Sequence, residues 1–190
     1  MTLLLLGLAI FFAIHGHAMM REHRAAMIER YGKNAYRALH SIGSVVGLAL
    51  MIYGFGAYRA SAWVDVWHPP LPVRHIALSL NIATFVLLAA TFLKGWISAK
   101  ARHPTTLAVI IWSAAHLFAN GDLGSMLLFG AFLVWGVAAW LSMERRPEEA
   151  IAAVPAFGRN DVIAVLTGLA AYAAMIFWLH RWLIGVSVLP

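Results

Sequence analysis

Hydrophobic and polar positions fall into long blocks along this chain. Six apolar stretches are separated by shorter polar segments, and they cover residues 3–20, 38–58, 76–97, 105–119, 123–143 and 162–188. A helix crosses the hydrocarbon core of a bilayer with about 20 predominantly apolar residues, and the fourth stretch is the short one. The pattern predicts an all-α fold, a polytopic membrane helical bundle of about six transmembrane helices.

Two of the polar segments carry a structural signal of their own. Asn120-Gly121-Asp122 has the composition of a tight turn and joins the fourth stretch to the fifth. The segment after the first stretch, REHRAAMIERYGKNAYR, fits two descriptions. It is either an amphipathic helix lying in the membrane interface or a solvated charged loop that fixes the topology.

Composition supports the membrane assignment. The chain has 190 residues, of which 62% are hydrophobic and 12% are charged, whereas about a quarter of the residues in a soluble domain are charged. We expect a single membrane domain over residues 1–190. The absence of cysteine excludes disulfides, thiolate metal sites and cysteine nucleophiles.

A net charge of +6 is compatible with a nucleic-acid partner. The positions of the basic residues on the predicted topology favour a different explanation. Most of the 14 lysines and arginines lie in or beside the first, third and fifth connections. These residues are Arg21, Arg24, Arg30, Lys33, Arg37, Lys94, Lys100, Arg102, Arg145, Arg146 and Arg159. Cytoplasmic loops carry the excess of Lys and Arg, so both termini are expected to be non-cytoplasmic. We expect a multi-pass protein of the bacterial inner membrane, with lipid and not nucleic acid as its partner.

Three of the nine histidines lie inside predicted spans: His15, His40 and His116. Ionisable side chains within a membrane usually face the bundle interior and mark a functional site or path, although hydrogen bonds that tie helices together are the simpler alternative. Trp112, His116 and Asn120 recur at intervals of four residues, so a continuous helix places them in one stripe.

Glycines accompany two of these histidines. His40, Ser44 and Gly47 form a second stripe, and the pair Gly43 and Gly47 allows another helix to approach closely. Gly16 directly follows His15, which lets a backbone or a flat ligand come near.

Imidazoles on different helices that face one another across an apolar gap suit haem iron. Zinc is less suitable, because the spans supply few carboxylates and no thiolates. With a rise of about 1.5 Å per residue, His15 lies nearer in depth to His40 than to His116. Spacing alone leaves open which two histidines form a pair.

Four segments together resemble the NnrU family of membrane proteins, which has the 15-cis-ζ-carotene isomerases as a distant branch. These segments are FFAIHGHA, RYGKNAYRALHSIGSVVGLAL, VWHPP and RHPTTLAVIIWSAAHLFANGDLGSMLLFGAFLVW. The resemblance covers about residues 3–146, and the last predicted helix, 162–188, is less distinctive.

The resemblance implies a function and a set of site residues. The isomerase branch binds haem b through two histidines that correspond to His15 and His116, and its similarity here is concentrated in these residues, Trp112 and the Arg102-His103-Pro104 motif. It uses a cysteine where this chain has Ser113, so a thiolate ligand is not expected. The implied activity is redox, nitric oxide-related or isomerase chemistry on an apolar small molecule, with denitrification as the context.

Two alternatives remain at this point. The Arg-His-Pro motif also resembles membrane transferases and reductases, in which Arg102 and His103 would meet the anionic part of S-adenosylmethionine or NADPH. Glu148-Glu149 is the only candidate for the paired acids of those enzymes. The other alternative is a non-catalytic membrane accessory protein of denitrification, whose histidines only bond helices together.

Overall fold

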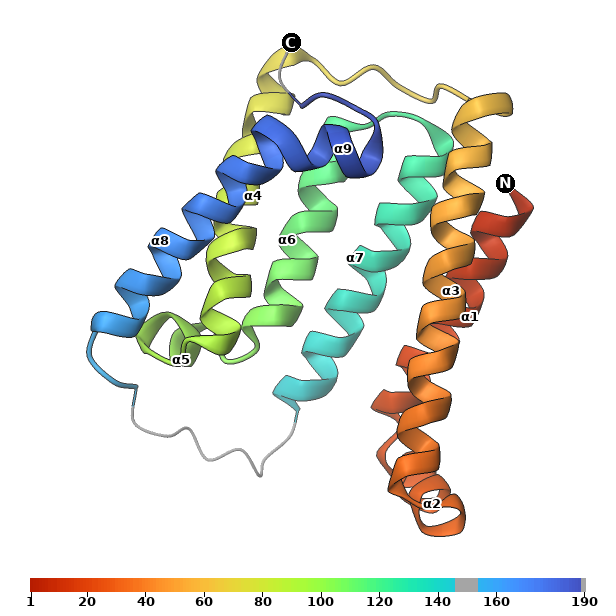
Figure 1. Ribbon diagram of the computed structural model, residues 1–190, viewed down its shortest axis with the longest axis vertical. Coiled ribbons are helices and arrows are strands. Elements are labelled where there is room, and N and C mark those ends of the chain that lie inside the picture. The colour runs from red at the N-terminus through yellow and green to blue at the C-terminus, as the bar shows by residue number, and fades with distance from the viewer. Residues whose placement is uncertain (146–153, 189–190) are drawn as a thin grey trace. The chain divides into compact units, whose positions relative to one another are not determined.

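The computed structural model describes residues 1–145 and 154–188. These residues form helices joined by short connections, with no strand and one isolated bridge between Asp65 and Asp122. The helices are α1 (Thr2–Met19), α2 (Arg21–Tyr31), α3 (Lys33–Ser61), α4 (Leu71–Phe92), α5 (Trp96–Ala101), α6 (Pro104–Ala119), α7 (Leu123–Glu144), α8 (Arg159–Ala174), η1 (Met175–Leu179, a π-helical turn) and α9 (His180–Ile184) (Figure 1). The all-α prediction is confirmed.

Five helical segments are long and apolar enough to cross a membrane: α1, α3, α4, α7 and the continuous run Arg159–Ile184. The fourth predicted span, 105–119, corresponds to α6, which is apolar but has only 16 residues. Only 11–22% of each long apolar window is buried inside the protein, so the remainder is suited to contact with lipid. The chain is a multi-pass membrane protein by these criteria.

The described chain divides into two compact units. The α1–α3–α7 unit consists of Met1–His68 and Asn120–Ser142. The α4–α6–α8 unit consists of Pro69–Ala119 and the described residues from Met143 onward. The expectation of one membrane domain stays a prediction.

In the α1–α3–α7 unit, glycines bring α1 and α3 into close contact. A Cβ atom on Gly47 would lie 2.9 Å from the backbone nitrogen of Phe11, and one on Gly54 would lie 2.3 Å from that of Leu4. The close approach predicted from the Gly43 and Gly47 pair is therefore confirmed. Outside α1, no atom of the described residues lies within 4 Å of the place where a Cβ on Gly16 would stand, so no described backbone from another helix approaches Gly16 closely.

The turn predicted at residues 120–122 is also confirmed, because α6 ends at Ala119 and α7 begins at Leu123. Asp122 is buried, and its Oδ1 accepts the Ser125 N–H at 2.9 Å, which satisfies a free donor at the start of α7. The carbonyl of Gly121 accepts the N–H groups of Val66 and Trp67.

The segment after α1 is helical, as one of the two descriptions requires. Its apolar positions, 25–28, are consecutive. Since each helical residue turns by about 100°, these positions spread around α2 and do not form one apolar face. The prediction that this helix is amphipathic is therefore wrong.

In the α4–α6–α8 unit, α4 packs against both α6 and α8 (Figure 1). The hydroxyl groups of Thr91 and Thr105 lie 3.0 Å apart between α4 and α6. Gly168 lets α8 approach the backbone of α4, and the Tyr172 hydroxyl donates to the Leu78 carbonyl at 2.9 Å. Small and polar residues thus join these three helices.

Candidate functional site

His15 lies in a cluster of rings contributed by α1, α3 and α7. Its imidazole stacks on Phe11, with ring centroids 3.9 Å apart. Trp135 meets it edge-on at 5.6 Å, and His40 lies at 5.0 Å with an interplanar angle of 60°. Phe12 and Phe132 contact each other and extend the aromatic wall. An ionisable side chain is therefore held in a mainly apolar, aromatic environment.

The helix itself fixes the orientation of His15. Its Nδ1 lies 2.8 Å from the carbonyl oxygen of Phe11, one helical turn earlier. A carbonyl only accepts, so Nδ1 carries the proton in the neutral ring. The lone pair is then on Nε2, which is the atom that a metal would bind.

His116 has the same arrangement in the α4–α6–α8 unit. Its Nδ1 lies 2.8 Å from the carbonyl oxygen of Trp112, which again places the lone pair on Nε2. The Trp112 and His116 rings lie 5.0 Å apart, as their predicted stripe requires. Asn120 lies one residue beyond the end of α6, so the helical stripe ends at His116.

The structure brings the rings of His15 and His40 together. Their rings are in direct contact on two closely packed helices. A macrocycle between them would have to separate these rings. The pairing of His15 with His40 and its pairing with His116 both stay predictions, and His116 lies in the other unit.

The surroundings of His15 fit a haem better than a bare ion. Residues 1–145 and 154–188 contain no group of three or more His, Asp or Glu side chains placed to hold a metal ion. A porphyrin supplies four nitrogen ligands, so the protein has to provide only one or two. The indole N–H of Trp135 is buried and has no hydrogen-bond partner among the described residues, although buried donors are normally satisfied. It is available to a polar group of a bound ligand beside His15.

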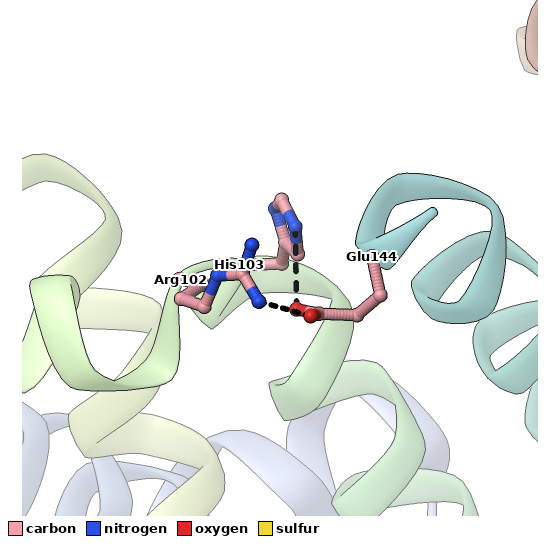
Figure 2. Close-up of polar contacts among 3 residues, drawn as sticks. All are labelled: Arg102, His103 and Glu144. Atoms are coloured by element: carbon pink, nitrogen blue, oxygen red, sulfur yellow. Dashed lines mark hydrogen bonds and ion pairs between the residues drawn. The ribbon is translucent and has the colours of Figure 1, made fainter. Parts of the chain in front are cut away.

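Arg102 and His103 both point toward Glu144, the last residue of α7 (Figure 2). The Arg102 guanidinium forms an ion pair with one carboxylate oxygen, and His103 Nε2 lies 3.8 Å from the other. The positive charge of the motif is thus already matched by an acidic side chain. This arrangement gives no support to a nucleotide phosphate at Arg102 and His103, and Glu148-Glu149 lies outside the described residues.

The backbone at Arg102 is strained. Its φ is +54°, and the His103 N–H donates to the Ala101 carbonyl at 2.5 Å. Together these values describe a γ-turn of the rare, strained kind. The turn separates α5 from α6 and directs Arg102 toward Glu144.

Sequence reasoning missed Trp135, Glu144 and Asp161. The Asp161 carboxylate is 1% exposed and accepts N–H groups from Trp96, Ile97 and Gly158, at 3.1, 2.8 and 2.9 Å. It caps the first turns of both α5 and α8. Its position three residues after Gly158, just before an apolar run, is a capping signal present in the sequence. Nothing in the sequence singles out Trp135 among eight tryptophans.

Comparison with protein families supplies the remaining finding. The profile of the family described as "NnrU protein" matches residues 3–188, so the match includes the last membrane helix as well as the four segments that resemble the family. No curated protein and no solved structure matches the chain. The chain therefore belongs to the NnrU protein family.

Proposed function

We propose that this protein binds haem b in the bacterial inner membrane, with His15 and His116 as ligands. Haem would supply redox, nitric oxide-related or isomerase chemistry on an apolar substrate. The isomerase-like similarity and the link to denitrification belong to this proposal.

The main support for this proposal is that the imidazoles of His15 and His116 have the same orientation relative to their own helices. Each donates from Nδ1 to the carbonyl four residues earlier at 2.8 Å. Each thereby keeps the lone pair on Nε2, and a backbone partner on the other ring nitrogen is the usual support of a metal-binding histidine. Two different helices, α1 and α6, thus orient their imidazoles through the same backbone contact.

The residues around each histidine have definite tasks in this proposal. Phe11 and Trp135 form apolar walls against the His15 ring, and Trp112 does the same for His116. These rings exclude water from an iron ligand and lower the local dielectric, which influences the reduction potential of a bound haem. The Trp135 N–H supplies one hydrogen-bond donor.

The test is an absorption spectrum of the purified full-length protein in detergent, oxidised and reduced. We expect a Soret band that is lost in His15→Ala and in His116→Ala. His68→Ala and His75→Ala are the matched controls, because they remove exposed imidazoles of the same chain outside the two ring clusters, and they should keep the band. A folded wild-type protein that stays colourless after haem supplementation would overturn the proposal.

A further inference from the structure

A groove of about 290 Å³ lies where the end of α1 meets α2, within the α1–α3–α7 unit. It is lined by His17, His23, Ala26, Met27, Arg30 and Tyr31. The groove surface is mainly apolar, with Ala26 and Met27 forming an apolar floor, and it also includes two imidazoles, a guanidinium and a phenol. None of these residues belongs to the ring cluster at His15, and Tyr36 lies between His17 and His40 of that cluster.

The spacing of the groove residues shows that one face of α2 forms it. Residues 23, 26, 27, 30 and 31 recur at the intervals that place side chains on the same side of a helix. Glu22 and Glu29 each precede a groove residue by one position, so they are turned away by about 100°. The described lining thus contains basic groups and no carboxylate.

The groove residues match the chemistry of a phosphate group. Arg30 presents a planar fork of N–H donors suited to two phosphate oxygens. Its guanidinium carbon lies 5.2 Å from the centroid of the Tyr31 ring, which holds the charge near the groove. His17 and His23 add donors from α1 and α2, and Met27 offers an apolar contact to whatever carries the phosphate.

The position of the groove favours an amphiphilic ligand. His17 lies in the last turn of α1, a helix apolar enough to cross a membrane, and α2 follows after one residue. Residues 21–37 contain five Lys and Arg residues and two Glu residues. Basic clusters beside a membrane helix attract anionic headgroups.

We propose that this groove binds a phosphate group, supplied by an anionic phospholipid or by a soluble phosphate ester. Arg30 makes the principal contact, and His17 and His23 assist. The apolar floor at Ala26 and Met27 faces the carbon chain of the ester. This binding does not depend on haem.

The experiment uses full-length protein in neutral detergent. Native mass spectrometry measures retention of added phosphatidylglycerol, with phosphatidylcholine for comparison, and calorimetry measures binding of glycerol 3-phosphate. Arg30→Gln should weaken binding of the phosphate-bearing probe roughly tenfold, the loss of a charged hydrogen bond. Arg21→Gln removes the same charge from another face of α2 and should leave binding unchanged.

Retention of phosphatidylglycerol that depends on Arg30 identifies a lipid source, and Arg30-dependent binding of glycerol 3-phosphate alone identifies a soluble one. The double variant His17→Asn and His23→Asn gives a second check and should also weaken binding. The proposal fails if neither probe binds, or if Arg21→Gln and Arg30→Gln lose binding equally.

Discussion

His15 and His40 lie in ring contact across the α1–α3 interface, with centroids 5.0 Å apart. This contact depends on the glycines that bring the two helices together. The two histidines look equivalent in the sequence, but their side chains differ in the structure. One carries an oriented Nε2, and the other packs against its ring.

The first prediction follows from this contact. His40→Phe keeps a ring beside His15 and removes both ring nitrogens, so bound haem should be retained with a shifted Soret band. His15→Ala should lose the band. Absorption spectra of the two purified variants decide the matter, and equal loss of haem in both would assign a ligand role to His40.

A second prediction concerns the packing of α1 on α3. Gly54→Ala places a methyl group 2.3 Å from the backbone nitrogen of Leu4. Such overpacking should lower the free energy of unfolding by about 1–3 kcal/mol. Thermal unfolding in detergent measures the effect.

Gly56→Ala is the matched control for this change. It lies on the same helix and meets nothing within 4 Å. Alanine favours a helix over glycine by up to about 1 kcal/mol, so this variant should be as stable as wild type or more so. Destabilisation of both variants to the same extent would show that the close approach at Gly54 is not the cause.

A third prediction concerns the strained turn at Arg102. Arg102→Ala and Arg102→Gly both remove the ion pair with Glu144, but glycine adopts a φ of +54° without steric conflict. The glycine variant should therefore unfold at the higher temperature, by a margin that reflects about 1 kcal/mol or more of relieved strain. If the alanine variant is the more stable one, the turn is not strained.

The hydropathy pattern predicted the membrane helices well, because lipid sets their length. It predicted residues 123–143 for α7, which spans Leu123–Glu144, and residues 3–20 for α1, which spans Thr2–Met19. It placed the start of the second span at residue 38, whereas α3 begins at Lys33. A helix continues past its apolar part wherever polar residues can remain in the interface.

The site was less predictable, because it depends on which helix faces pack against one another. The sequence indicated His15, His40 and His116 by their position in apolar stretches. The Nδ1 contacts of His15 and His116 with the preceding helical turn, and the approach of Trp135 to His15, could be found only from the structure. The Glu144 partner of Arg102 was missed because 42 residues separate the two along the chain.

A fourth prediction tests Asp161 as a cap for two helices. Asp161→Ala leaves the N–H groups of Trp96, Ile97 and Gly158 without their acceptor, so the melting temperature should fall clearly. Asp161→Asn keeps one acceptor oxygen, so its melting temperature should fall less. Glu29→Ala, at an exposed position of α2, is the control and should have little effect. Equal stability of wild type and Asp161→Ala would contradict the capping role.

The last prediction tests the proposed orientation of the chain. The protein has no cysteine, so a single introduced thiol reports its own side of the membrane. Ser61→Cys lies at the end of α3, and Glu22→Cys lies in the basic segment after α1. With the excess of Lys and Arg on the cytoplasmic side, a membrane-impermeant maleimide should label Ser61→Cys on spheroplasts and label Glu22→Cys only after permeabilisation. The reverse pattern would place both termini in the cytoplasm. It would also move the groove at His17 and Arg30 to the outer face, where its ligand would have to come from the outer leaflet.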